Sequence, residues 1–186
     1  CDIALKYGGT IDKFIGDSVM VFFGDPDTNG AKEDAISCCH MAMEMLTFLE
    51  KNQQHFQEMY NFPEKLEVRV GIHNGLCNVG NFGSEQRLDY TAIGRAVNVA
   101  SRLEQAAPKN SILVSSAVRN LIKSKFQTSS PIDVKAKGID KPIASYILTR
   151  NTQENKKVTK EIDGLKLEYD PKKIDKQTLL KIIDDL

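Results

Sequence analysis

Asn98 and Arg102 stand four positions apart in the stretch A-V-N-V-A-S-R-L-E-Q, residues 96–105. The stretch is predicted to be helical, and residues four apart project from one face of a helix. An amide beside a five-donor guanidinium fork is a good receptor for an oxyanion such as phosphate. Taken singly, each has a simpler interpretation: Asn98 bonds to local backbone, and Arg102 forms a surface ion pair with Glu104 or Asp89.

A carboxylate stands at the tip of a predicted hairpin near the start of the chain. Two apolar runs rich in β-branched and aromatic residues, 11–15 and 19–23, flank the pair Gly16-Asp17, which is the pattern of a tight turn. A carboxylate held there reaches past the sheet edge and suits a hard cation. For an isolated Gly-Asp pair, turn chemistry alone is the simpler interpretation. Lys13 in the preceding run and the oxyanion-binding pair downstream favour the functional one.

Three motifs, in this order, resemble class III nucleotide cyclases, the adenylate/guanylate cyclase family. They are K-F-I-G-D (13–17), V-R-V-G-I-H-N-G (68–75) and Y-T-A-I-G-R-A-V-N-V-A-S-R (90–102). The resemblance is collinear and covers roughly the first four-fifths of the chain. It implies a ferredoxin-like βαββαβ core. It also implies a reaction in which the ribose 3′-oxygen of a nucleoside triphosphate attacks the α-phosphorus and expels pyrophosphate.

The resemblance makes Asp17 one of two aspartates that hold two Mg²⁺ or Mn²⁺ ions. The other aspartate is expected in an F-x-D-I-x-G-F-T-like strand ahead of Cys1. Asp2-Ile3 imitates that motif but lacks its flanking residues and lies too close to Asp17. On this basis the chain is expected to begin within the catalytic domain, and residues 1–186 alone are expected to be inactive or nearly so.

The resemblance also implies the roles of the remaining site residues. Arg102 would stabilise charge on the α-phosphoryl oxygens, and Asn98 would orient the ribose or a bridging water. Lys13 and Thr91 would contact the purine. Lys137, in V-K-A-K-G (134–138), resembles a family lysine near the triphosphate, and a solvated surface charge is an equally good interpretation there.

The base-contacting pair predicts which purine is used. An ammonium has donors only, so Lys13 satisfies the acceptor at adenine N1 and leaves the N1–H of guanine without a partner. Thr91 can accept from adenine N6, although a hydroxyl both donates and accepts and so discriminates less. Guanylate cyclases typically carry Glu and Cys at these places, and many adenylate cyclases carry Lys and Asp. Lys with Thr resembles a subclass that includes bicarbonate-responsive soluble cyclases. The sequence therefore predicts an adenylate cyclase acting on ATP.

Hairpins mixed with helices predict an α+β fold, a largely antiparallel sheet with helices packed on it. The predicted helices cover 2–7, 31–60, the stretch around Asn98 and 116–124. The predicted strands are 11–15 with 19–23, 66–73 with 76–82 around Asn74-Gly75, and then 88–93, 111–114, 132–137 and 143–148.

The composition predicts a soluble globular protein of the cytoplasm. Hydrophobic residues make up 41%, and 25 basic residues balance 25 acidic ones, so no basic excess favours nucleic acid or an anionic membrane. No apolar run approaches a membrane span, and the first residues do not form a signal peptide. The four cysteines lack zinc spacing and are interpreted as reduced thiols.

Residues 1–149 are predicted to be the cyclase domain. Residues 150–186 are predicted to be a Lys-rich linker with a strand near 166–169 and an amphipathic helix over 172–186. The family builds its site between two subunits, and this chain carries both the metal residue and the base- and phosphate-binding residues. A head-to-tail homodimer is therefore implied. A non-catalytic cyclase-like module that binds nucleotide or regulates a partner is the alternative. A GGDEF-type diguanylate cyclase is disfavoured, because Thr-Ile follows Gly8-Gly9.

Overall fold

The computed structural model describes residues 1–134, 142–149, 158–162 and 165–169. The chain forms two compact units, 1–150 and 151–186. In the second unit, β10 (Val158–Ile162) and β11 (Leu165–Tyr169) pair as an antiparallel hairpin. Residues 158–160 of the predicted linker are therefore strand, whereas β11 coincides with the strand predicted near 166–169. Lys137, residues 135–137 of a predicted strand and the predicted helix over 172–186 lie outside the described residues.

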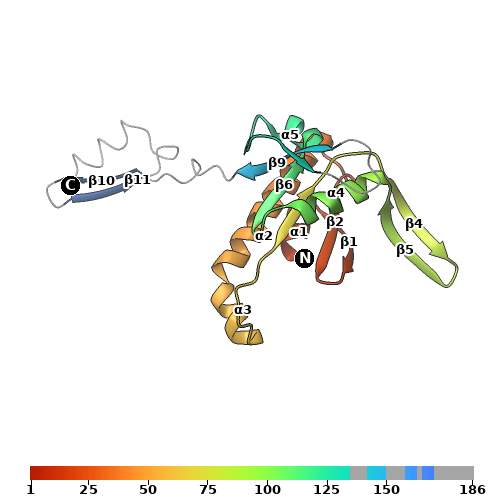
Figure 1. The fold of residues 1–186 in the computed structure, drawn as a ribbon, viewed down its shortest axis with the longest axis horizontal. Helices are drawn as coiled ribbons and strands as arrows, with labels where there is room; N and C mark the ends of the chain where they lie inside the picture. Colours follow the sequence, from red (N-terminus) through yellow and green to blue (C-terminus); the bar gives the residue numbers. More distant parts are fainter. Residues whose placement is uncertain (135–141, 150–157, 163–164, 170–186) are drawn as a thin grey trace. The chain divides into compact units, whose positions relative to one another are not determined.

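The first unit contains both helices and strands along its whole length (Figure 1). In chain order these are α1 (Asp2–Lys6), β1 (Thr10–Ile15), β2 (Ser18–Phe22), α2 (Ala31–Lys51), α3 (Gln53–Tyr60), β3 (Arg69–Ile72), β4 (Asn78–Ser84), β5 (Arg87–Ile93), α4 (Arg95–Ala106), β6 (Ser111–Ser115), α5 (Ser116–Ile122), β7 (Gln127–Thr128), β8 (Ile132–Val134) and β9 (Ile143–Thr149). The α+β class is confirmed. The long helix predicted over 31–60 is two helices that meet at Asn52.

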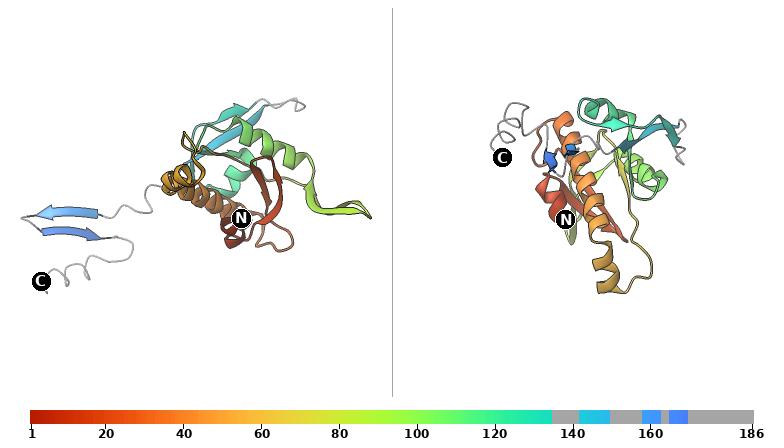
Figure 2. Two further views of the ribbon diagram at one scale, coloured as in Figure 1. Left: turned by 90° about the horizontal axis from the view of Figure 1, so that it is seen from below. Right: turned by 90° about the vertical axis from the view of Figure 1, so that its left-hand side faces the viewer.

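A central sheet separates two hydrophobic clusters. Its strand order is β3-β6-β9-β7, with β8 also paired to β9, and only β3 and β6 among the described pairs run parallel. Along β6, Ile112 and Val114 pack with α2 and α5, while Leu113 packs with Val99 and Leu103 of α4. Alternate side chains of a strand point to opposite faces, so β6 is buried on both. Helices α2 and α4 accordingly lie on opposite sides of these strands (Figure 2).

Helix α4 packs closely against β3 at Gly71. A Cβ at Gly71 would lie 2.2 Å from the Glu104 nitrogen and 2.4 Å from the Ala100 oxygen. Only a residue without a side chain allows the helix backbone to come this close. Because α4 also carries Asn98 and Arg102, this contact helps to position both side chains.

The predicted hairpin between 66–73 and 76–82 is wrong. β3 instead pairs in parallel with β6, from Arg69 opposite Ser111 to Ile72 opposite Val114. β4 pairs with β5 through a two-residue turn at 85–86. Closing that short loop costs little entropy, and β3 gains burial of Ile72 in the cluster around α2. These gains outweigh the local turn signal of Asn74-Gly75.

The cysteines and the helices can be compared with what the composition predicts. All four cysteines are free, and burial raises the pKa of the Cys39 thiol to about 12, so this thiol stays protonated at neutral pH. Within the described part of the chain, no helix combines the length and the apolar character that a membrane crossing requires.

Candidate active site

Lys13 and Thr91 lie in contact although 78 positions separate them. Lys13 Nζ donates to Thr91 Oγ1 at 2.8 Å. The contact joins β1 of one hairpin to β5 of the other. Thr91 is 4% exposed, whereas the Lys13 side chain is 43% exposed. The structure therefore brings the predicted base-contacting pair together and leaves the Lys13 side chain partly exposed.

Asp12 is buried beneath this pair, and the sequence analysis did not predict that it contacts the base-selecting residues. Its side chain is 0% exposed. Oδ2 accepts from the Thr91 hydroxyl at 2.8 Å and from the Ala92 N–H at 3.0 Å. Oδ1 lies 3.2 Å from Lys13 Nζ, an ion pair without hydrogen-bond geometry. A signal was available, because a carboxylate inside an apolar strand needs partners when it is buried.

A β-bulge turns Asp12 and Lys13 toward the same neighbour. Ile11 pairs with Val21 and Lys13 with Met20, so Asp12 is an extra residue on β1. Successive side chains of a regular strand point to opposite faces, and a bulge breaks that alternation. The irregularity allows both charged side chains to reach Thr91.

Asp17 occupies the two-residue turn between β1 and β2, as predicted. Ile15 pairs with Ser18 across the turn, and Gly16 has a φ of +63°. Asp17 is exposed, and its side chain has no hydrogen bond or ion pair to the described residues. A free carboxylate fits as one oxygen ligand of a hard divalent cation. Within the described ranges, no three His, Cys, Asp or Glu side chains gather closely enough to hold a metal ion.

Asn98 and Arg102 project from α4, whose buried residues are their sequence neighbours Val99 and Leu103. Asn98 is exposed, and Arg102 Nη1 donates to Gln105 Oε1 at 3.0 Å. The alternative interpretation of Arg102 as the ion-pair partner of Glu104 or Asp89 is wrong. Those carboxylates pair at 3.5 Å with Arg69 and Arg87, respectively. Within the described part of this chain, neither Asn98 nor Arg102 forms a hydrogen bond or ion pair with Asp17 or Lys13.

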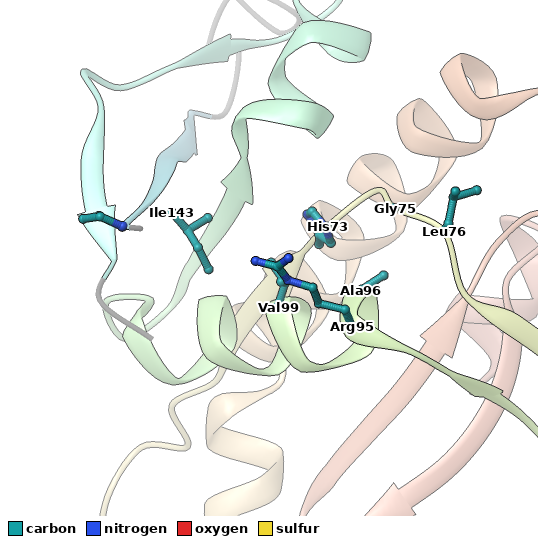
Figure 3. A pocket seen from close by; sticks show the side chains of 8 residues that line it. His73, Gly75, Leu76, Arg95, Ala96, Val99 and Ile143 are labelled. Carbon is teal, nitrogen blue, oxygen red and sulfur yellow. The ribbon is translucent and has the colours of Figure 1, made fainter. Parts of the chain in front are cut away.

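A separate cavity of about 390 Å³ lies between α4, the end of β3 and the start of β9. Its lining includes His73, Leu76, Arg95, Val99 and Ile143 (Figure 3). None of the five predicted site residues that the structure describes lines it. His73 Nδ1 lies 2.8 Å from Ser115 Oγ, and burial lowers the pKa of His73 below its usual 6.5.

Acid is expected to destabilise the fold through His73. Because the pKa is lower in the folded chain than in the unfolded chain, the contribution of His73 to stability is complete above about pH 6.5 and is lost as the pH falls through the lowered value. Urea unfolding from about pH 7 to about pH 5 should show the free energy of unfolding falling, and His73→Gln should flatten that slope. His55→Gln, at an exposed position on α3, is the control. An unchanged slope in His73→Gln would assign the effect to other groups.

The chain matches a family model described as the adenylate and guanylate cyclase catalytic domain over residues 7–150. An adenylate cyclase of Anabaena cylindrica is 37% identical over 146 residues, which are 75% of this chain and 28% of that protein. The chain therefore spans less than a third of that relative.

Solved structures agree with the sequence match. The crystal structure of the adenylyl cyclase CyaB from P. aeruginosa has a TM-score of 0.77 and 45% identity, covering 81% of this chain and 76% of that chain. The guanylyl cyclase Cya2 has a TM-score of 0.73 and 30% identity, covering 79% and 73%. Both the predicted family and its cyclase fold are confirmed: this chain belongs to the class III adenylate/guanylate cyclase family.

Proposed function

We propose that the protein containing this chain is an adenylate cyclase that converts ATP to 3′,5′-cyclic AMP and pyrophosphate for signal transduction in the cytoplasm. The observation that carries the proposal is the Lys13–Thr91 contact at 2.8 Å. Two residues 78 positions apart meet as the resemblance requires, one donor beside one hydroxyl. The Lys13 ammonium donates to adenine N1, and the Thr91 hydroxyl accepts from adenine N6.

Arg102 and Asn98 bind the phosphate and ribose in this proposal. The guanidinium has five N–H donors, and its bond to Gln105 uses one nitrogen. The others remain for the α-phosphoryl oxygens, where negative charge grows as the 3′-oxygen attacks. Asn98, exposed one turn earlier on α4, orients the ribose or a bridging water. Lys137, outside the described residues, is proposed to lie near the triphosphate.

Asp17 is proposed to hold divalent metal. When bound, two Mg²⁺ or Mn²⁺ ions would lower the charge on the triphosphate and favour ionisation of the 3′-hydroxyl. The turn position keeps the Asp17 carboxylate clear of the sheet, and it is not engaged by the described residues. By the family resemblance a second carboxylate shares these ions, and we propose that a strand ahead of Cys1 supplies it.

The site is proposed to form between two copies of the chain. Apolar side chains are exposed around it, with Phe14 66% exposed beside the Asp17 turn and Leu88 60% exposed on β5. Burying such side chains between subunits is favourable. A head-to-tail pairing would bring Asp17 of one copy to Arg102 of the other.

The direct test measures cyclic AMP and cyclic GMP formation by the natural protein that contains this chain, with and without EDTA. We expect cyclic AMP from ATP, loss of turnover on chelation, and recovery with excess Mg²⁺ or Mn²⁺. Cyclic GMP as the main product would overturn the base assignment, and activity that withstands the chelator would overturn the metal role. Nucleotide binding without any turnover would identify the non-catalytic alternative.

A further inference from the structure

We propose that Asp12 determines nucleotide specificity as a positioning residue, by directing the hydroxyl proton of Thr91 away from the purine. The inference deepens the proposed use of ATP and rests on it. A free threonine hydroxyl selects poorly between the two purines. It can accept from the 6-amino group of adenine, and it can equally donate to O6 of guanine.

Among the described residues, the groups that bond to or pair with the Asp12 carboxylate are all donors. Oδ2 receives the Ala92 N–H and the Thr91 hydroxyl, and Oδ1 faces the Lys13 ammonium at 3.2 Å. A carboxylate accepts and does not donate. The proton of the Thr91–Asp12 bond therefore comes from Thr91 and points at Asp12.

The bond to Asp12 uses the only proton of the Thr91 hydroxyl, so only its two lone pairs remain for other partners. One lone pair accepts from Lys13 Nζ at 2.8 Å, and a second lone pair is left. That lone pair can accept the 6-amino group of adenine. Against guanine it would face the O6 lone pairs, which is repulsive.

Lys13 is oriented by the same carboxylate. Its ammonium donates one of its three N–H bonds to Thr91 and is held 3.2 Å from Asp12 Oδ1 by charge attraction, without a hydrogen bond. Two N–H bonds therefore remain, and one of them can face the purine beside the free acceptor of Thr91. The Lys13 donor then faces the acceptor N1 of adenine, and the Thr91 acceptor faces its 6-amino group. Against guanine, the donor would face N1–H and the acceptor would face O6, so neither pair forms a hydrogen bond.

Burial makes the arrangement persistent. Asp12 is 0% exposed and Thr91 4% exposed, so water does not readily compete for these bonds. The Ala92 N–H anchors the carboxylate to the backbone of β5, next to the hydroxyl that it orients. An exposed carboxylate would not hold a hydroxyl in one orientation.

The experiment compares Asp12→Asn with the unmodified full-length protein in kcat/KM for ATP and for GTP. Asparagine has nearly the same shape but replaces one acceptor by a donor, which meets either Thr91 or Lys13. Thr91 or Lys13 then loses its orientation. We expect the preference for ATP over GTP to fall about tenfold or more. Asp133→Asn, the same change at an exposed site on β8, should leave the preference unaltered. A preference unchanged in Asp12→Asn would overturn the inference.

A second background separates orientation of Thr91 from other effects. Thr91→Val keeps the shape and removes the hydroxyl, so no proton is left to direct. Asp12→Asn should therefore change the preference much less in Thr91→Val than in the unmodified protein. Equal changes in both backgrounds would show that Asp12 does not act through the Thr91 hydroxyl.

A measurement on the unmodified protein keeps the inference testable if Asp12→Asn does not fold. The Thr91 hydroxyl proton should exchange slowly with water in NMR spectra and lie close to the Asp12 carboxylate. Rapid exchange would overturn the inference. Absence of ATP turnover would instead overturn the proposed function, and the proton measurement and equilibrium binding of ATP and GTP would still test Asp12.

Discussion

Arg102→Ala is expected to lower ATP turnover about a thousandfold or more, the scale at which an arginine on a phosphoryl transition state contributes. Asp17→Ala should be at least as damaging, because the metal site loses a ligand. Arg119→Ala is the matched control. Arg119 stacks on Tyr146 and bonds to Thr128, away from α4 and the β1–β2 turn, so its loss should leave turnover nearly unchanged.

Mixing the two inactive chains is expected to restore activity. In a head-to-tail dimer each site takes Asp17 from one copy and Arg102 from the other, so a heterodimer of the two mutants has one intact site. Random exchange makes half of the dimers heterodimers, each with one of its two sites intact. About a quarter of the unmodified activity should therefore return. Mixtures that stay inactive while subunit exchange is demonstrated would place all the residues in one chain's own site.

Replacing Lys13 by Glu and Thr91 by Cys together is expected to lower kcat/KM for ATP about a hundredfold or more and for GTP far less. The exchange reverses donor and acceptor at the purine edge. Turnover with both nucleotides is the measurement. Equal losses on ATP and GTP would mean that the two residues support only the fold.

Asp12 is expected to destabilise the variant that carries Lys13→Glu and Thr91→Cys. Glu at position 13 would place a second carboxylate where Lys13 Nζ now lies 3.2 Å from Asp12 Oδ1, and like charges at that distance repel. Adding Asp12→Asn to the double variant should therefore raise its thermal midpoint and its turnover with GTP. If the triple variant is no more stable than the double one, the two carboxylates do not interact.

Features set by near neighbours were predictable from the sequence. The Gly16-Asp17 turn follows from a residue suited to positive φ between two apolar runs, and the structure has that turn. Asn98 and Arg102 share a helix face because helical periodicity requires it. The α+β class and the cyclase family follow from the mixture of hairpins and helices and from collinear motifs, and both are confirmed.

Features that depend on distant segments were decided only by tertiary structure. Asn74-Gly75 is a good local turn signal, yet β3 lies beside β6, because burial of Ile72 and the short β4–β5 loop outweigh it. In the sequence, Asp12 is simply a charged residue beside Lys13 in a short strand, and its partners are a threonine and an amide 79 and 80 positions away. Only the bulge in β1 and the packing of β5 against it bring them together. The candidate site residues came from motifs and from the family resemblance, whereas the direction of the Thr91 hydroxyl bond depends on a contact between distant segments that no local pattern records.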